Sequence, residues 1–181
     1  MNKYQAHPTA VIDEGALIGE GCTIWHFCHI SGGASIGKGC TLGQNVYVAP
    51  KVNIGQRVKI QNNVSLFTGV IVEDDVFLGP SCVFTNILTP RSEVNRKDQF
   101  LKTTVKKGAS IGANAVILCG NEIGRYAMVG AGSVVTKSIK DFELVAGNPA
   151  AHFGWVGRYG EKLQFDSDGW AECKKTGYRY F

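Results

Sequence analysis

The stretch "VYVAPKVNIGQRVKIQNNVSLFTGVIVEDDVFLGPSCVF", residues 46–84, decides the fold. A large apolar residue recurs in it at every sixth position, from Val48 through Ile60 to Phe84. A second, generally smaller apolar residue precedes each of these by two positions, from Val46 to Cys82. A period of six matches neither the 3.6-residue period of a helix nor the simple alternation of a half-buried strand. It indicates a chain that repeats one short strand and one turn many times.

The same rhythm covers most of the chain. It begins at Ile12, is lost after Phe84 and resumes from Val105 to Val135. All nineteen expected positions hold Ile, Leu, Val or Phe, although these types make up little more than a quarter of the sequence. We expect the large and the small apolar residue to point inward. Gly often follows the large residue, as at Gly19, and we expect it to take a corner conformation with φ > 0.

This pattern resembles the hexapeptide-repeat family, whose chains wind as a left-handed parallel β-helix with three hexapeptides in each 18-residue coil. The resemblance covers roughly residues 12–140. It implies an all-β fold with a β-helix domain over 1–140 and a C-terminal extension over 141–181 that packs on the helix end. Such a prism has flat walls and buries its core coil on coil. Binding sites therefore have to come from an excursion of the chain or from a neighbouring subunit.

The interruption, at about residues 88–104, predicts one loop extruded from a corner of the prism. It contains Arg91 and Arg96, and arginine forks suit diphosphates and carboxylates. A loop of this length inside a regular solenoid is more often functional than not, although a solvated surface loop would have the same composition. We interpret Arg91 and Arg96 as substrate-binding residues, without deciding which meets a diphosphate and which a carboxylate.

An 18-residue period also stacks polar residues on the corners. His26, Gln44 and Asn62 form one such column, with Asn63 beside it. We interpret these four residues as substrate-binding, in a column that faces a corner of the neighbouring subunit. Asn86, at the root of the loop, is the candidate catalytic residue. Both sets are also compatible with ordinary corner turns, in which Asn is common.

The coils after the loop carry small residues on their turns. Gly112, Ala113, Gly130 and Ala131 would let a long, thin ligand lie along the wall and would expose backbone N–H groups. Lys137 could meet phosphates there. We interpret these five residues as the binding site of a cofactor, with the reservation that the fold requires glycine-rich turns in any case.

Composition excludes several other classes. The net charge is only +4 with 19% charged residues, which is too mild for a dedicated nucleic-acid binder. No stretch is long and apolar enough to span a membrane. Four of the six cysteines, Cys22, Cys28, Cys40 and Cys82, occupy the small apolar slot, and there is no CxxC pair that would suggest a zinc site. We expect a soluble cytoplasmic protein without bound metal and with no membrane or nucleic-acid partner.

Several runs narrow the resemblance, among them "TIWHFCHI", "KIQNNVSLF", "VFTN", "PRSEVNRKDQF" and "GWVGRYGEKLQF". They are similar to the WlbB/WbpD nucleotide-sugar N-acetyltransferases. The resemblance implies a homotrimer with sites between subunits, and acetyl-CoA as co-substrate. The implied reaction acetylates the 3-amino group of UDP-2-acetamido-3-amino-2,3-dideoxy-D-glucuronic acid, a lipopolysaccharide or O-antigen precursor. It also implies that Asn86 of "FTN" meets the sugar amine. Many hexapeptide acetyltransferases use a histidine base, but no histidine lies between His29 and His152 here.

Three alternatives remain open from the sequence. The same chemistry could act on a dTDP-3-amino-3,6-dideoxyhexose, since such relatives share "FTN" and a run like "PRS". A trimeric β-helix can be a γ-type carbonic anhydrase, but His26 and His29 have no third histidine in nearby coils. A non-enzymatic β-helix protein would be expected to have flat, regular Thr faces and no charged excursion.

Overall fold

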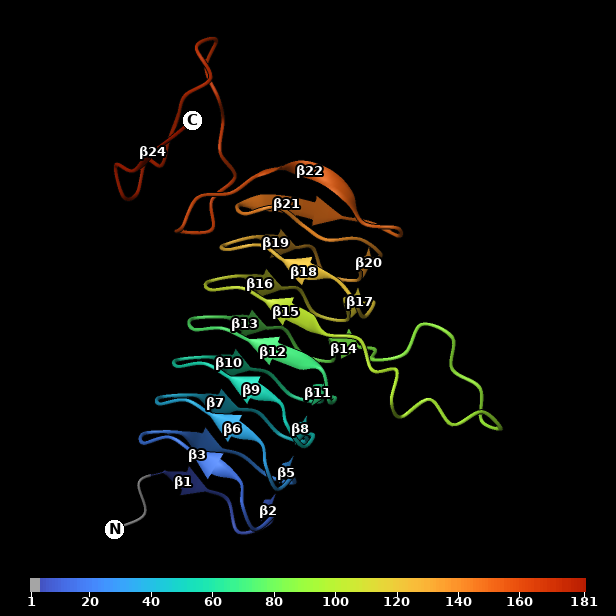
Figure 1. Cartoon of the computed structure of the whole chain (residues 1–181). Helices are drawn as coiled ribbons and strands as arrows, with labels where there is room; N and C mark the ends of the chain where they lie inside the picture. Colours follow the sequence, from blue (N-terminus) through green and yellow to red (C-terminus); the bar gives the residue numbers. More distant parts are fainter. Residues whose placement is uncertain (1–3) are drawn as a thin grey trace.

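The computed structural model describes residues 4–181, and the rhythm of the sequence appears in it as a parallel β-helix. Each coil places one short strand in each of three sheets, here called A, B and C (Figure 1). In Figure 1 the chain climbs from the N-terminus at the bottom. The strands of sheet C run leftward in front and those of sheet A run rightward behind. The winding is therefore left-handed, as the resemblance implies.

Most strands are only two residues long, with one residue pointing outward and one inward, because the other four residues of each hexapeptide form the corner. Sheet A contains β1 (Gln5–Ala6), β4 (Thr23–Ile24), β7 (Thr41–Leu42), β10 (Lys59–Ile60), β13 (Phe77–Leu78), β16 (Ser110–Ile111), β19 (Met128–Val129), β21 (Glu143–Ala146) and β22 (Ala151–Trp155). Sheet B contains β2 (Val11–Ile12), β5 (His29–Ile30), β8 (Tyr47–Val48), β11 (Ser65–Leu66), β14 (Val83–Phe84), β17 (Val116–Ile117) and β20 (Val134–Val135). Sheet C contains β3 (Leu17–Ile18), β6 (Ser35–Ile36), β9 (Asn53–Ile54), β12 (Val70–Val72), β15 (Thr103–Val105) and β18 (Glu122–Ile123).

The predicted inward residues form the core. Ile30, Leu42 and Leu66 have no exposed surface, and the small slot beside them is closed by residues such as Cys40 and Val64. One cluster of buried apolar side chains runs from Cys22 to Ala150. Burying apolar surface against the coils above and below is what stabilises a solenoid of this kind.

The corners correct one expectation. The glycines that directly follow the large apolar residue, such as Gly37, do not have positive φ; the residue two positions later does, as at Gly39 and Asn45. Gly37 is needed for another reason. A Cβ atom there would lie 2.5 Å from the carbonyl oxygen of Gly55 in the next coil. These glycines therefore permit close stacking of the coils, while the left-handed conformation falls on Gly, Asn and several other residue types.

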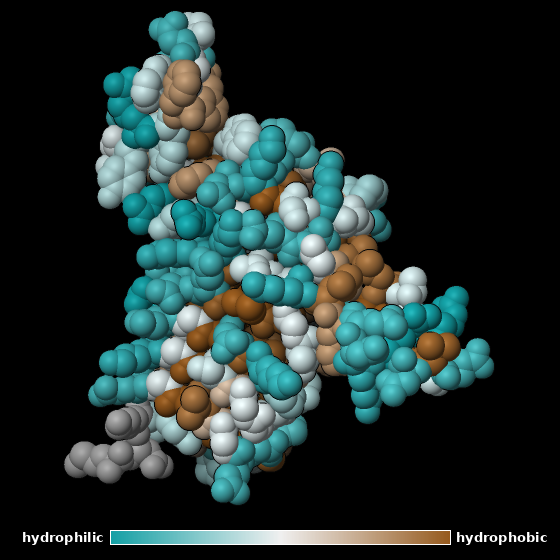
Figure 2. Space-filling model, in the orientation of Figure 1, coloured by the Kyte–Doolittle hydropathy of each residue, from teal (hydrophilic) through white to brown (hydrophobic). Residues whose placement is uncertain are grey.

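The extruded loop leaves the prism after β14 and returns at β15 (Figure 1). Its neck is closed by a hydrogen bond of 3.0 Å from the Leu101 N–H to the Asn86 carbonyl. Because Thr103 already belongs to β15, the loop ends about two residues before the expected limit at 104. Figure 2 shows that the loop is largely hydrophilic, whereas apolar surface surrounds its root. Leu88 and Leu101 are among the exposed apolar side chains of this segment.

The parallel ladder of sheet A continues through β21, which pairs with β19. β22 then folds back antiparallel on β21, and a small hairpin of β23 (Ala171–Glu172) and β24 (Arg179–Tyr180) follows. The division of the chain at residue 140 stays a prediction. Nowhere between residues 4 and 181 is there a helix long and apolar enough to cross a bilayer.

Candidate functional site

Each coil turns three corners, and the candidate residues lie on two of them. We call them corner AB, which leads from a sheet A strand to a sheet B strand, and corner BC, which leads from sheet B to sheet C. The pairing of Ile24 with Leu42, and of Leu42 with Ile60, aligns the residues that follow them on corner AB. His26, Gln44 and Asn62 therefore stack in one column, as the 18-residue spacing predicted. The Gln44 N–H donates to Asn62 Oδ1 at 3.0 Å.

A second ladder supports this column. Asn45 Nδ2 donates to Asn63 Oδ1 at 3.2 Å, and both residues have positive φ. Their main-chain N–H groups donate to the carbonyls of His26 and Gln44, respectively. Asn63 thus has a structural task that accounts for its amide side chain. Its role in substrate binding stays a prediction.

The structure also brings together two groups that the sequence left apart. Leu78 pairs with Ile111, and Ile111 pairs with Val129. Corner AB therefore continues upward with Pro80, Ala113 and Ala131, directly above Asn62. The loop interrupts the 18-residue count, which is why spacing alone did not reveal this alignment. The predicted substrate column and the predicted cofactor residues Gly112, Ala113, Gly130 and Ala131 form one continuous edge.

The upper half of this edge presents free backbone donors. The N–H of Gly112 already donates to the Val129 carbonyl at 2.8 Å, so it is not available to a ligand. The N–H groups of Ala113 and Ala131 have no partner within residues 4–181. Lower on the same edge the N–H of Gln44 is occupied by a side chain from the next coil. The residues stacked above Pro80, Ala113 and Ala131 have no such side chain. The N–H groups of Ala113 and Ala131 therefore stay available. The N–H groups of His26 and Asn62 also have no partner within residues 4–181, but these residues have larger, polar side chains.

Asn86 lies on corner BC, in the coil that also contributes Pro80 to corner AB. Its carbonyl is held by the Leu101 N–H, and the neighbouring Thr85 hydroxyl accepts a hydrogen bond of 2.9 Å from the Cys119 N–H. These contacts fix the backbone on both sides of the Asn86 side chain. In one chain, the whole width of sheet B separates Asn86 from the column on corner AB.

Lys137 does not join the other predicted cofactor residues. Phe84 pairs with Ile117, and Ile117 pairs with Val135. Lys137 is therefore on corner BC, two coils above Asn86 and in line with it. The width of sheet B separates Lys137 from Ala113 and Ala131, just as it separates Asn86 from the column on corner AB. A ligand on corner AB of one chain could meet Lys137 only from a neighbouring prism.

The loop arginines differ from each other. The Arg91 side chain is exposed and donates only to the carbonyl of Pro90 at 3.1 Å. Arg96 is half-buried and donates to Gln99 Oε1 at 3.0 Å, and its Nε atom is buried without a partner in the described chain. Neither guanidinium is in an ion pair within residues 4–181. Both positive charges are therefore available to an anion.

The inner cysteines are not reactive groups. All six are free thiols and all are buried. Burial raises the pKa of Cys40 to about 11 and that of Cys82 to about 12, so both stay neutral. Cys28 Sγ donates to the Gly43 carbonyl at 3.0 Å in the next coil. Cys22, Cys28, Cys40 and Cys82 fill the core as small apolar groups, as their spacing predicted.

His29 is a surface residue. Its Nε2 lies 3.1 Å from Asp13 Oδ2, and its ring contacts Tyr47 with centroids 5.5 Å apart. Across residues 4–181, no three His, Cys, Asp or Glu side chains are grouped so that they could hold a metal ion.

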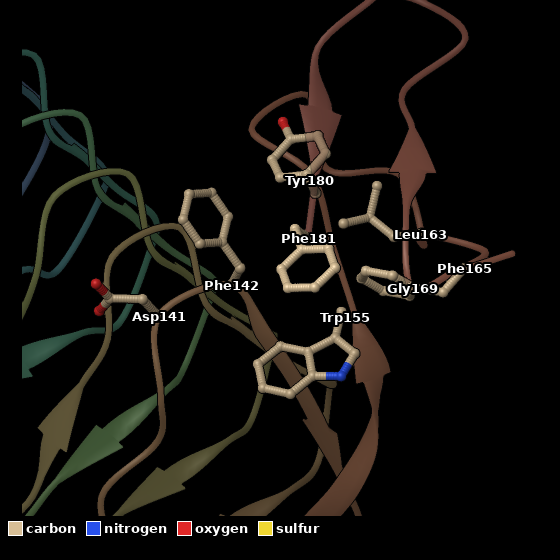
Figure 3. A pocket seen from close by; sticks show the side chains of 8 residues that line it. All are labelled: Asp141, Phe142, Trp155, Leu163, Phe165, Gly169, Tyr180 and Phe181. Carbon is tan, nitrogen blue, oxygen red and sulfur yellow. The ribbon is translucent and has the colours of Figure 1, made fainter. Parts of the chain in front are cut away.

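A separate hollow of about 380 Å³ lies between the end of the prism and the C-terminal segment (Figure 3). The side chains of Phe142, Trp155 and Phe181 surround it, with Tyr180 above. The rings of Phe142 and Tyr180 meet edge to face at 5.7 Å. The hollow is beside the corner between sheets C and A, remote from the two candidate corners. We interpret it as part of the contact that anchors the C-terminal segment.

Sequence reasoning missed two residues beside the column. Trp25 and Gln61 occupy the position that Gly43, Gly79, Gly112 and Gly130 take in the other coils of corner AB. With Gly43 they line a hollow of about 410 Å³. The signal that could have revealed them is the replacement of an expected glycine by a large side chain.

The fold and its repeats thus define a parallel β-helix built from hexapeptides. A family model described as "Bacterial transferase hexapeptide (six repeats)" matches residues 15–50, and one described as "Hexapeptide repeat of succinyl-transferase" matches residues 103–137. The chain is 55% identical over 84 residues to dTDP-3-amino-3,6-dideoxy-alpha-D-galactopyranose 3-N-acetyltransferase of Aneurinibacillus thermoaerophilus, covering 46% of this chain and 43% of the relative. The chain spans less than half the length of the curated relatives that it matches.

Solved structures share the fold. A galactoside acetyltransferase in complex with coenzyme A has a TM-score of 0.61 at 24% identity, covering 73% of this chain and 70% of the other. A variant of perosamine N-acetyltransferase from Caulobacter crescentus, in complex with CoA and GDP-perosamine, has a TM-score of 0.58 at 22% identity. That match covers 83% of this chain and 56% of the other. At these identities the similarity establishes the architecture alone.

Proposed function

We propose that this protein is an acetyl-CoA-dependent N-acetyltransferase that acts on the amino group of a nucleotide-linked amino sugar. One observation supports this most directly. Corner AB presents polar side chains in its lower coils and bare backbone donors in its upper coils, and the change occurs at the coil that also contains Asn86. Such an edge suits two elongated ligands that meet end to end.

The upper half suits the pantetheine arm of coenzyme A. Ala113 and Ala131 have short side chains, so an extended chain can approach the backbone. Their free N–H groups can donate to amide and thioester carbonyls of the arm. Lys137 would meet this ligand from corner BC of a neighbouring subunit. The lower half, with His26, Gln44 and Asn62, suits the acceptor nucleotide.

The proposed chemistry needs a neutral amine and a place for the developing charge. The Asn86 carboxamide oxygen would accept one amine N–H and direct the nitrogen lone pair at the thioester carbonyl. Alignment of both reactants by the whole site can contribute ~7–11 kcal/mol without a base, and the Asn86 hydrogen bond is one part of it. The Ala113 N–H would stabilise the oxyanion. As the C–S bond breaks, the CoA thiolate leaves and takes the surplus proton from the nitrogen, which yields the amide and neutral CoA.

For the acceptor we propose the 3-amino group of UDP-2-acetamido-3-amino-2,3-dideoxy-D-glucuronic acid, in lipopolysaccharide or O-antigen biosynthesis. The unpaired guanidinium groups of Arg91 and Arg96 could then bind the sugar carboxylate and the diphosphate. The second candidate is a dTDP-3-amino-3,6-dideoxyhexose. It is favoured by the 55% identity to an enzyme named for such a substrate.

We propose that the protein acts as a cytoplasmic homotrimer. Corners AB and BC of one prism bound the same sheet and point away from each other. Asn86 of one subunit can meet the column of another when the prisms lie side by side. A monomeric protein would leave the two halves of the site apart.

The test is acetyl-CoA consumption with each of the two sugars, using wild-type protein and the Asn86→Ala variant. Rapid turnover of the uronate alone would support the first candidate, and preference for the 6-deoxy sugar would support the second. Because Asn86 orients rather than removes a proton, we expect its loss to lower kcat about 10²-fold. A fall of about 10⁵-fold would contradict this role, and no turnover of either sugar would contradict the proposed function.

A further inference from the structure

The hollow between Trp25 and Gln61 has the shape of a slot. The two residues occupy equivalent positions on corner AB, two coils apart, and Gly43 lies between them. Coils repeat at about 4.8 Å, so about 10 Å separates the two main chains at the mouth of the slot. When a side chain such as that of Trp25 covers one wall, the remaining height between the two main chains accommodates the van der Waals thickness of one flat ring.

Gly43, at the floor of the slot, permits close stacking of the next coil. A Cβ atom there would overlap the Asn62 side chain and would lie 2.9 Å from the Gln61 carbonyl carbon. Trp25 forms one wall. Its indole is 49% exposed and nearly parallel to the His26 ring, at 8° with centroids 6.3 Å apart. Exposed indole faces stack well on heterocyclic bases.

The polar groups around the slot are the side-chain amides of Gln44, Gln61 and Asn62, together with the Thr41 hydroxyl and the His26 ring. No Lys, Arg, Asp or Glu is among the residues that line it. Asn62 Oδ1 accepts from the Gln44 N–H, which leaves the Asn62 amide nitrogen as a donor. The side-chain amides of Gln44 and Gln61 form no hydrogen bond within residues 4–181. The slot therefore offers three amide NH₂ groups and two amide oxygens, and it has no cation for a phosphate.

We infer that this slot binds the pyrimidine base of the nucleotide sugar, as a 2,4-dione of the uracil or thymine type. This inference rests on the proposed function and adds where on the prism the base of the nucleotide is held. The edge of a pyrimidine dione presents two acceptors on either side of one donor, which matches a surplus of amide donors. Guanine presents the opposite pattern, with two donors and one acceptor. The base would stack on Trp25, which lies three coils below Asn86, and the diphosphate would extend toward the loop arginines.

The experiment measures affinities of the full chain for UDP, dTDP, GDP and ADP by isothermal titration calorimetry. The variant is Trp25→Leu. The matched control is Phe27→Leu, because Phe27 is an exposed aromatic residue at the same corner that does not line the slot. We expect Trp25→Leu to weaken UDP and dTDP binding about 10- to 100-fold and Phe27→Leu to change it less than twofold. Should Trp25→Leu fail to fold by circular dichroism, Gln61→Leu tests the same slot through its amide.

The outcomes separate the two proposals. Pyrimidine preference that is lost in Trp25→Leu supports the inference. UDP affinity that is equal in Trp25→Leu and wild type overturns the inference and leaves the proposed function intact. GDP binding as tight as UDP binding overturns the pyrimidine assignment. ADP binding as tight as UDP binding also overturns it when saturating CoA already fills the site for its own adenosine diphosphate. If wild-type protein binds none of the four nucleotides, the proposed function fails and the inference fails with it.

Discussion

Replacement of Ala113 by proline removes one backbone N–H from the edge and little else. Pro80 occupies the equivalent position in the coil directly below, so this corner accommodates the fixed φ of proline. The Ala113 carbonyl, which accepts from the Gly132 N–H at 2.8 Å, is retained. The Ala113 N–H has no partner to lose. We therefore expect the folded state of Ala113→Pro to be about as stable as wild type, or up to ~1 kcal/mol more stable.

The expected effect on catalysis is large. Loss of one oxyanion donor costs about 10²–10³ in kcat, or ~2.7–4 kcal/mol. The hydrogen bond strengthens as the thioester oxygen gains charge, so kcat should fall while the KM for acetyl-CoA changes little. A loss of binding alone would instead raise KM at constant kcat.

The assay is initial-rate kinetics of acetyl-CoA consumption with the accepted amino sugar, together with thermal unfolding. Lys38→Pro is the matched control. Lys38 occupies the same turn position on the corner between sheets C and A, and its N–H also has no partner in the described chain. If Ala113→Pro and Lys38→Pro both keep kcat within threefold of wild type, Ala113 does not stabilise the oxyanion.

Three further predictions concern stability and are measured by urea unfolding. Thr103 is fully buried, and its Oγ1 has no partner in the described chain. Thr103→Val should therefore stabilise the protein by ~1–2 kcal/mol. A loss of stability would show that the hydroxyl has a partner. Gly33 has φ +78 and no atom within 4 Å of an added Cβ, and Asn tolerates positive φ, so Gly33→Asn should be nearly neutral. Gly37→Asn should cost ~1–3 kcal/mol, because its side chain would overlap the next coil. Equal effects of the two substitutions would contradict this division between the glycines. Burial of Glu143 opposes its ionisation, but hydrogen bonds from the Lys140 N–H and His152 prevail and lower its pKa below the ordinary 4.5. The ionised carboxylate therefore stabilises the fold above about pH 4.5, and this contribution is lost as the pH falls through the lowered pKa. Glu143→Gln should have a flatter acid limb of stability than wild type, and identical slopes would refute the assignment.

Individual residues show how far the sequence could be read. The column of His26, Gln44 and Asn62 was predictable because no interruption occurs between these coils. The role of the corner glycines was misread, since composition does not distinguish a residue that needs positive φ from one that must leave space for the next coil. The free N–H of Ala113 could be distinguished from that of Gly112 only once the ladder hydrogen bond from Gly112 to Val129 was visible. Trp25 and Gln61 were missed because they appear as ordinary exceptions to a glycine pattern.

The sequence by itself determined the β-helix and which residues face its core, because a strand of two residues leaves only one inward direction and a period of six repeats it in every coil. Only the tertiary structure decided how the coils after the loop align with those before it. The loop breaks the count, and the pairings of Leu78 with Ile111 and of Phe84 with Ile117 restore it. These pairings align Ala113 with the column of His26, Gln44 and Asn62, and Lys137 with Asn86. Which backbone N–H groups remain free is likewise decided by the coil stacked on each of them.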